Sequence, residues 1–437
     1  MSKKKYKIFF ISDHQLSTAG VGIQARFLIE GLLRTGKYSF ICFGAAIKHA
    51  DYRNAMLSPD FIIKPVDGFG TKEMVKNVLV TERPDAVFIL TDPRQFFWLW
   101  EMEDEIHQVC PIVYWHVWDN DPYPAFNKPW YDSNDFIGCI SWKTYEMLKP
   151  YYPDVEYIPH AFPKNIYFPM DEKQVSELRK MHFGHRHDWF IALWVNRNAT
   201  RKMSGELLRN WKIFLDKLEE QYGHRNALLL LHTDPLDIEG TNLFEVQALY
   251  ELQDNVVFSV EKLEFEQMNM IHNITDCCIN ISKNEGFGLS TLISLQCGKP
   301  IIALKTGGLE RQVVDYRDGF QLGVALEPVT RKLIGSQVVP YIFEDFASEY
   351  DVANALLKIY SLSEQEKQEI KRRALEYVDH EFNYENMIKK WDENLERTIV
   401  NYSGKSKVRF SIIGRNDNGN KIYNSMRKEV FDNMVEL

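Results

Sequence analysis

Residues 284–300, NEGFGLSTLISLQCGKP, place the carboxylate of Glu285 on a glycine-rich turn that runs directly into a helical pattern. Gly286 and Gly288 let a ligand approach the backbone closely, and the free amides at the start of a helix favour an anion. Two hydroxyl residues follow that can cap the helix or donate hydrogen bonds to a phosphate, Ser290 and Thr291. Glu285 would therefore lie beside a phosphate site, where its oxygens can accept hydrogen bonds from sugar hydroxyl groups. The alternative is a glutamate that only caps a turn.

A cluster of positive charge follows the apolar run DWFIALWVN at residues 188–196. Arg197, Arg201 and Lys202 come where this predicted strand runs into a helix. Arginine can clamp two phosphate oxygens and lysine supplies a mobile point charge, so the cluster suits a diphosphate. A solvated basic helix start is the other interpretation, but the helix dipole disfavours cations there unless an anion offsets them.

The elements that position these residues alternate between apolar strands and amphipathic helices, which is typical of parallel sheets covered by helices on both faces. The strands predicted in the first half are 6–12, 38–44, 85–90, 111–116, 135–141 and 155–160, with a helical pattern starting at Gly20. The alternation restarts in the second half, with strands at 188–196, 226–232, 255–260, 276–282 and 299–305, and the chain is then helical from about 345 to 400.

This restart predicts an α/β fold of two Rossmann-like domains whose parallel sheets face a central cleft. The predicted boundaries are residues 1–165 for the first domain, 166–186 for a linker, 187–385 for the second domain, and 386–437 for a helix that returns to the first domain plus a polar tail. Ligands in such sheets bind beyond the carboxyl ends of the strands. The glycine-rich turn and the basic cluster both follow strands, so both lie where a ligand is expected.

Composition narrows the class of protein. The chain has 437 residues and a net charge of −9, which argues against binding nucleic acid through overall charge, although a local basic groove remains an alternative. Its six cysteines form no C-x-x-C pair, which predicts buried free thiols in a reducing compartment. The apolar run near the start is too short for a signal peptide or a membrane span, so we expect a cytoplasmic protein without a membrane span.

Taken together, the motifs resemble those of the retaining GT-B glycosyltransferases of family 4, also called glycosyl transferases group 1. The motifs are R-x4-K at residues 197–202, E-G-F-G-L at 285–289, A-G-V-G at 19–22 with an alanine in place of the family's first glycine, IPHAF at 158–162, and K-T-G-G-L-E at 305–310. The resemblance covers most of residues 5–320. It implies that the protein moves a glycosyl group from a nucleoside diphosphate sugar to an acceptor hydroxyl and retains the anomeric configuration.

The resemblance also implies roles for individual residues. Arg197 and Lys202 would hold the donor diphosphate, and Glu285 would contact the donor sugar, in the second, nucleotide-sugar domain. His116 matches a histidine that family members place at the donor sugar; a histidine hydrogen-bonded inside an aromatic loop is the alternative. The first domain would serve the acceptor. The residues implied in donor binding are Gly20, Gly22, Gly286, Phe287, Gly288, Leu289, Ser290 and Thr291.

One position departs from the family pattern. The family usually carries a second glutamate eight residues after the first, which binds the nucleotide ribose, and here that residue is Ile293. The sequence therefore does not predict the nucleotide base. No metal ion or other cofactor is expected, because arginine and lysine can supply the positive charge. The alternative is the D-x-D pattern of WDND, residues 118–121, which binds a metal in the other large glycosyltransferase fold.

The acceptor is predicted to be a glycan or a small molecule, and two alternatives remain open. Hydroxymethylated DNA bases would fit the aromatic loops and the basic tail from residue 401, and a catalytically silent nucleotide-sugar binding protein would fit the missing glutamate. Residues 96–108 are predicted to be a helix packed on the sheet, although they and 122–131 could instead offer stacking surfaces to an acceptor. Residues 327–346 look like an insertion beside the cleft.

Overall fold

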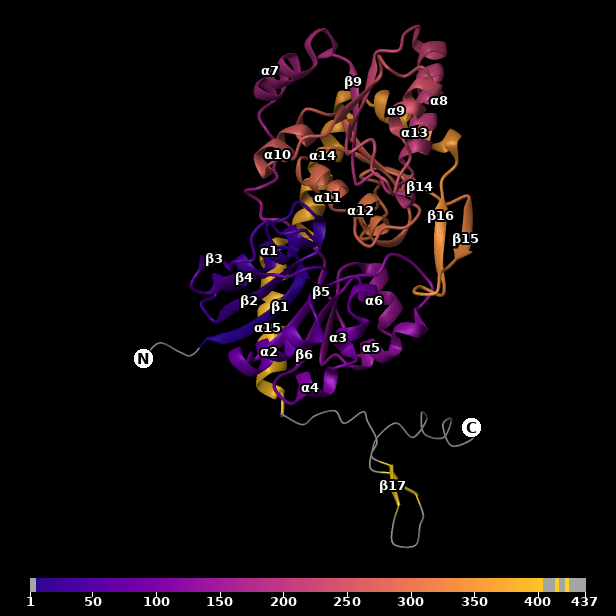
Figure 1. The fold of residues 1–437 in the computed structure, drawn as a ribbon. Helices are drawn as coiled ribbons and strands as arrows, with labels where there is room; N and C mark the ends of the chain where they lie inside the picture. The colour runs from indigo at the N-terminus through magenta and orange to yellow at the C-terminus, as the bar shows by residue number, and fades with distance from the viewer. Residues whose placement is uncertain (1–4, 404–412, 416–420, 424–437) are drawn as a thin grey trace.

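The structure, a computed structural model, describes residues 5–403, 413–415 and 421–423 and contains two large sheets, one in each half of the chain (Figure 1). The first sheet has the order β3-β4-β2-β1-β5-β6-β7-β8, and its neighbours are parallel except β3, which runs antiparallel to β4. Its strands are β1 (Tyr6–Asp13), β2 (Tyr38–Ala45), β3 (Ala55–Ser58), β4 (Phe61–Pro65), β5 (Ala86–Thr91), β6 (Ile112–His116), β7 (Phe136–Cys139) and β8 (Glu156–Tyr157). The helices around it are α1 (Gly20–Leu33), α2 (Lys72–Glu82), α3 (Phe97–Trp100), α4 (Glu103–His107), α5 (Lys128–Asp132) and α6 (Trp142–Leu148).

The second sheet is parallel throughout, in the order β11-β10-β9-β12-β13-β14. Its strands are β9 (Phe190–Val195), β10 (Ala227–His232), β11 (Val256–Ser259), β12 (Cys277–Asn280), β13 (Ile301–Leu304) and β14 (Gly323–Leu326). The helices of this half are α7 (Glu172–Phe183), α8 (Ser204–Tyr222), α9 (Leu243–Leu249), α10 (Phe265–Asn273), α11 (Leu289–Gln296), α12 (Glu310–Val313) and α13 (Glu349–Tyr360). The predicted α/β fold with two Rossmann-like domains is confirmed.

An antiparallel hairpin extends from the second domain alongside the first (Figure 1). It consists of β15 (Thr330–Ile334) and β16 (Ile342–Phe346), and it occupies the segment expected to be an insertion. Strand β15 is exposed along its whole length, whereas Glu344 and Asp345 of β16 are buried. The insertion is therefore an ordered arm rather than an irregular loop.

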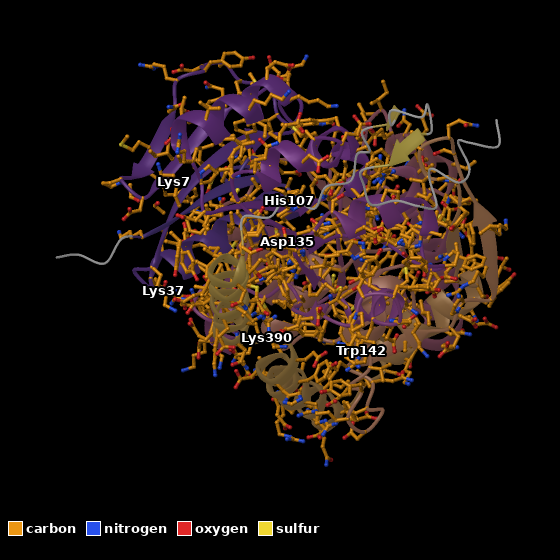
Figure 2. The ribbon with its side chains drawn as sticks, turned by 90° about the horizontal axis from the view of Figure 1, so that it is seen from below. Lys7, Lys37, His107, Asp135, Trp142 and Lys390 are labelled. Atoms are coloured by element: carbon orange, nitrogen blue, oxygen red, sulfur yellow. The ribbon has the colours of Figure 1, made fainter. Side chains whose placement is uncertain are left out.

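Two long helices lead from the second domain back to the first, and after them the strands β17 (Ile413–Arg415) and β18 (Lys421–Tyr423) form an antiparallel pair. Helix α14 (Glu364–Glu381) packs on α11 of the second domain, and α15 (Tyr384–Asn401) packs on α1 of the first. Trp391 of α15 is fully buried, with its ring 4.7 Å from Phe88 and 5.4 Å from Trp115. Polar contacts also join α15 to the first domain, and Figure 2 labels two of the lysines that make them, Lys37 and Lys390. Lys37 of the first domain pairs with Asp392 and Glu396 of α15. The ammonium group of Lys390, on α15, donates to the carbonyl of Tyr157. Helix α15 is thereby fastened onto the first sheet.

Several local features differ in detail from those expected. Residues 96–108 form two short helices, α3 and α4, instead of one, and residues 166–186 contain the three-turn helix α7. All six cysteines are buried and unpaired, as predicted. None of the described helices is both long and apolar enough to cross a membrane. Most of the tail from residue 401 lies outside the described residues.

Replacing Trp391 with alanine should lower the free energy of unfolding by about 3–5 kcal/mol, because a fully buried aromatic ring leaves a cavity among Phe88, Trp115 and Phe136. Urea denaturation followed by circular dichroism measures the change. Lys389→Ala on the same helix is the control: its side chain is 73% exposed, and we expect a change within about 0.5 kcal/mol. Equal losses in the two variants would show that α15 is not held by its buried face.

Candidate active site

The site lies where the carboxyl ends of the two sheets face each other. The loop after β1 leads into α1, and the loop after β12 leads into α11, and the two helix starts are in direct contact across the domains. A Cβ atom placed on Gly20 would lie 2.7 Å from Cδ1 of Leu289. A Cβ on Gly22 would overlap the carbonyl of His14 in its own loop. The two glycines therefore keep the loop tight and bring the domains together, and the room that they were predicted to leave for a phosphate remains a prediction.

The E-G-F-G turn closes tightly onto the start of α11. Gly288 has φ of +93°, in the left-handed region that favours glycine, and it stands at the N-terminal cap of the helix. The hydroxyl of Thr291 lies 2.8 Å from the carbonyl of Gly288 and 2.6 Å from Oε1 of Gln312. No side chain caps this helix start, so the capping use considered for Thr291 is not seen, and its contact with a phosphate remains a prediction. The ring of Phe287 packs edge-on against His160 of the IPHAF motif, 5.1 Å between centroids.

Lys202 and Glu285 form a buried ion pair at the centre of this region. Lys202 ends the short 3-10 helix η4 (Thr200–Lys202) after β9, and Glu285 follows β12, the strand beside β9. Their exposed fractions are 7% and 8%, and the ammonium group donates to Oε2 of the carboxylate. Burial opposes the charge on Glu285, but the charges of Lys202 and Arg201 outweigh it and lower the pKa of Glu285 below its ordinary value. The carboxylate is therefore held ionised in a place with little water.

Arg201 brings a second cation to this pair, and the first domain supplies a carboxylate. Nη1 of Arg201 donates to the carbonyl of Asn284 at 3.0 Å and lies 4.0 Å from carboxylate oxygens of both Glu285 and Asp119. Asp119 follows β6 of the first domain, and a Cβ on Gly286 would lie 2.9 Å from its Oδ1. Asp119 is thus a site residue that the sequence prediction missed. Its place after the carboxyl end of a strand was the signal that could have found it.

The two carboxylates of the D-x-D pattern point to different cations. Asp119 lies by Arg201, whereas Oδ2 of Asp121 is 3.4 Å from Nζ of Lys143 and 3.8 Å from Nη1 of Arg331. Both are engaged with positive side chains of the protein itself.

Two predicted catalytic residues lie apart from the Lys202–Glu285 pair. The guanidinium of Arg197 is 57% exposed and bonded to Asp237 at 2.6 Å, with Glu239 at 3.1 Å. His116 is fully buried, and its Nε2 lies 2.9 Å from the hydroxyl of Tyr131. Burial lowers the pKa of His116 to about 3, so the ring is neutral at physiological pH. The structure shows the hydrogen-bonded arrangement that was the alternative for His116; the sugar-contact role of His116 and the diphosphate role of Arg197 remain predictions.

Ile293, at the position of the family's ribose-binding glutamate, faces the hydrophobic interior. It is 7% exposed and belongs to the core that also contains Phe287 and Leu292. A buried aliphatic side chain offers no acceptor to a ribose hydroxyl. Any ribose contact must therefore come from another residue or from the backbone.

Comparison with known proteins now bears on the identity of this site. Residues 183–325, which include η4 and the E-G-F-G turn, match the family model described as glycosyl transferases group 1. The predicted resemblance is confirmed, and the fold is GT-B.

A trehalose synthase from Pyrococcus horikoshii is 31% identical over 108 residues, which are 24% of this chain and about a quarter of that relative's length. Sucrose-phosphate synthase from Thermosynechococcus elongatus has a similar structure, with a TM-score of 0.69 and 16% identity, covering 91% of this chain and all of that one. The Anabaena protein HepE, solved in complex with UDP-glucose, has a TM-score of 0.66 and 14% sequence identity to this chain. The similarity covers 90% of this chain and 99% of HepE. At these identities the solved structures establish the fold.

Lys202→Met should destabilise the protein by about 3–5 kcal/mol at neutral pH, because it leaves the carboxylate of Glu285 buried without its close cation. The double variant Lys202→Met/Glu285→Gln should recover part of the loss, since no unpaired charge remains. The penalty of the single variant should shrink as the pH falls, because burial without Lys202 raises the pKa of Glu285 and the carboxylate takes up a proton. Urea denaturation of the three proteins between about pH 4 and pH 8 measures this. A single variant as stable as wild type would mean that the pair is not buried in solution.

Proposed function

We propose that this protein is a retaining glycosyltransferase that moves a sugar from a nucleoside diphosphate sugar to a hydroxyl group of a glycan or a small molecule. The observation that carries the proposal is the Lys202–Glu285 pair, which is buried at the carboxyl ends of adjacent strands beside the glycine-rich start of α11. The ammonium group of Lys202, the carboxylate of Glu285 and the backbone amides at the start of α11 therefore lie close together. They match the three parts of the donor near the bond that breaks: diphosphate, sugar hydroxyls and phosphate oxygens.

Departure of the diphosphate builds negative charge on its oxygens. Lys202 and Arg201 would stabilise that charge, and Arg197 would join them by leaving Asp237 and Glu239. Preorganised charges of this kind act strongly where water is excluded, and each donor can be worth a few kcal/mol in the transition state. The leaving phosphate would take the proton of the acceptor hydroxyl, so no separate base or metal ion is required. His116, neutral and buried, would help shape the wall near the reaction centre.

Glu285 would change partners when the donor binds. A diphosphate that attracts Lys202 frees one or both oxygens of Glu285, and a buried carboxylate without its partner strongly favours new hydrogen bonds. Hydroxyl groups of the donor sugar are the donors at hand. The pair would therefore exchange an internal contact for two contacts to the substrate, which favours a nucleotide that carries a sugar over the free diphosphate.

UDP-sugars are the first donors to test, because HepE was solved with UDP-glucose. Sucrose-phosphate synthase and trehalose synthase are named for small saccharide products, which supports a glycan or small molecule over modified DNA as acceptor. We also propose a cytoplasmic location, for which the unpaired thiols of all six cysteines are support.

A panel of UDP, GDP, ADP, CDP and dTDP sugars should reveal the donor by thermal stability. A ligand at a hundred times its dissociation constant adds about 2.7 kcal/mol to the folded state. We expect a raised melting temperature with one nucleotide class, and its loss in the double variant Lys202→Met/Glu285→Gln, which keeps no buried charge. No rise with any sugar nucleotide would contradict the proposed donor class.

Arg197→Ala should lower turnover with the identified donor by about a hundredfold, and Arg201→Ala by a similar factor, because each removes a cation from the departing diphosphate. Arg209→Ala on α8, whose side chain is 45% exposed, is the matched control and should leave turnover unchanged. Steady-state kinetics of the three variants decide the roles. Unchanged turnover in Arg197→Ala would show that Arg197 does not bind the diphosphate. Of the two arginines in residues 197–202, only Arg201 would then keep that role.

A further inference from the structure

A loop of the first domain is docked onto the hairpin of the second. We call residues 118–126 the docking loop and residues 330–346 the arm. The amide of Phe343 on β16 donates to the carbonyl of Asp121 at 2.8 Å, and Nδ2 of Asn120 donates back to the carbonyl of Phe343 at 3.2 Å. The docking loop thereby uses the outer edge of β16, the edge that β15 does not cover. The arm therefore holds the first domain at a strand edge by one backbone hydrogen bond and one hydrogen bond from a side chain.

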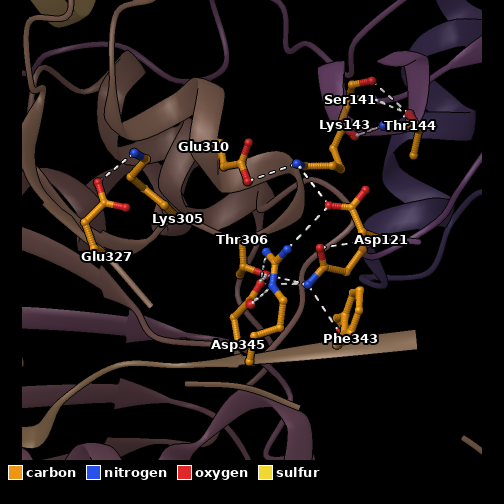
Figure 3. Close-up of polar contacts among 12 residues, drawn as sticks. Asp121, Ser141, Lys143, Thr144, Lys305, Thr306, Glu310, Glu327, Phe343 and Asp345 are labelled. Carbon is orange, nitrogen blue, oxygen red and sulfur yellow. Dashed lines mark hydrogen bonds and ion pairs between the residues drawn. The ribbon is translucent and has the colours of Figure 1, made fainter. Parts of the chain in front are cut away.

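A buried polar cluster lies at the centre of this contact, shown in Figure 3 with Thr306, Phe343 and Asp345 labelled. Asn120, Thr306 and Asp345 are all fully buried. Oδ2 of Asp345 accepts from Nδ2 of Asn120 at 2.8 Å and from the hydroxyl of Thr306 at 2.7 Å, while Nε of Arg331 donates to Oδ1 at 2.6 Å. The partners Thr306 and Arg331 belong to the second domain. Asn120 is the member that crosses between the domains.

An apolar contact and an ion-pair chain border this cluster. Trp118 of the docking loop packs with Val339 of the arm in one hydrophobic cluster, and the ring of Tyr341 lies edge-on to Phe126 at 5.0 Å. The hydroxyl of Tyr341 also accepts from the amide of Ala125 at 3.0 Å. Phe126 lies in the segment 122–131 that was considered from the sequence as a stacking surface for an acceptor, and its ring is used here within the protein.

The ion-pair chain runs from Asp121 through Lys143 to Glu310. Nζ of Lys143 lies 3.4 Å from Asp121 and 3.2 Å from Glu310 of α12, as Figure 3 shows. Lys143 and Asp121 belong to the first domain and Glu310 to the second. The contact between the domains thus continues beyond the arm to the K-T-G-G-L-E motif.

We propose that the arm is a clasp that holds the docking loop against the second domain and thereby positions Asp119 in the active site. Asp119 precedes Asn120 in the chain, so the clasp fixes its carboxylate beside Gly286 and 4.0 Å from Arg201. The arm lies beyond residue 325, where the match to the group 1 family ends. The effect on catalysis rests on the proposed function; the docking of the loop does not.

The bonding pattern makes the clasp reversible. When Asn120 leaves, Asp345 keeps Thr306 and Arg331, so opening strands no buried charge. The amide of Asp345 is bonded to the carbonyl of Lys283 within the second domain at 2.8 Å, and that bond persists. Opening exposes the amide of Phe343 and the side chain of Asn120, and it separates Trp118 from Val339 and Lys143 from Glu310. The amide of Ala125 loses the hydroxyl of Tyr341 but keeps the carbonyl of Tyr123 at 2.9 Å.

Hydrogen exchange with residue-level fragmentation tests the clasp in the full chain. The variants are Asn120→Ala and Tyr341→Ala, with Leu333→Ala as the control, because Leu333 lies on the outer strand and is 62% exposed. In both clasp variants we expect the amide of Phe343 to exchange at least about tenfold faster, whereas the amide of Asp345 keeps its wild-type rate. Leu333→Ala should leave both amides unchanged. Unchanged exchange at Phe343 in both clasp variants would overturn the proposal.

Kinetics test the positioning of Asp119. Asn120→Ala and Tyr341→Ala should lower kcat/KM for sugar transfer about tenfold while the dissociation constant of the free nucleoside diphosphate stays within about twofold, because the cations proposed to bind its phosphates all belong to the second domain. Equal losses of nucleotide affinity and activity would indicate a general structural effect and overturn the positioning role. If the wild-type protein transfers no sugar, the proposed function fails, and the exchange rates still decide whether the arm is a clasp.

Discussion

The carboxylate of Glu285 and the ammonium group of Lys202 are buried together. Lys202 helps to keep Glu285 ionised, whereas burial lowers the pKa of Lys202 despite the attraction of Glu285. Two buried charges offset their loss of hydration only with close geometry and additional polar partners. Here the hydroxyl of Ser282 lies 3.5 Å from Glu285, and Arg201 adds a second positive charge while its own group is anchored on the carbonyl of Asn284. The pair therefore fixes the loops after β9 and β12 against each other, and the groups that could meet a donor are arranged around it.

A loop of the first domain can approach the Lys202–Glu285 pair because a glycine, Gly307, lies where it meets the loops of the second domain. Gly307 has φ of +50°, and a Cβ there would overlap the carbonyl groups of both Glu285 and Asp119. The amide of the next residue, Gly308, donates to the carbonyl of Glu285 at 2.8 Å. Loops from both domains thus meet backbone to backbone, with no side chain between them. A ligand in that place would contact amides and carbonyl groups held in fixed positions, which suits a site that must orient a polar substrate.

The sequence revealed what depends on local pattern. Central strands such as β1, β9 and β12 are mostly apolar because both of their faces are buried. The rule for the carboxyl ends of parallel strands placed Lys202 and Glu285 correctly near one another. The contact of Arg197 could not be predicted in this way. Its partner Asp237 is 40 residues away on another loop, and the sequence does not show which of several carboxylates a flexible arginine side chain will bind. Asp119 was visible in the D-x-D pattern, but its orientation depends on how the domains dock.

The arm was not predicted as strands because its sequence lacks the alternation of a half-buried sheet. Residues 330–334 are exposed throughout, and an isolated two-stranded hairpin buries too little to be stable by itself. Its order must therefore come from the surface that it meets. The outer edge of β16 is satisfied by both domains at once, by the first at Phe343 and by the second at Asp345. An edge shared in this way depends on the relative position of the two domains, so the segment hardest to interpret in the sequence is also the one most sensitive to how the domains dock.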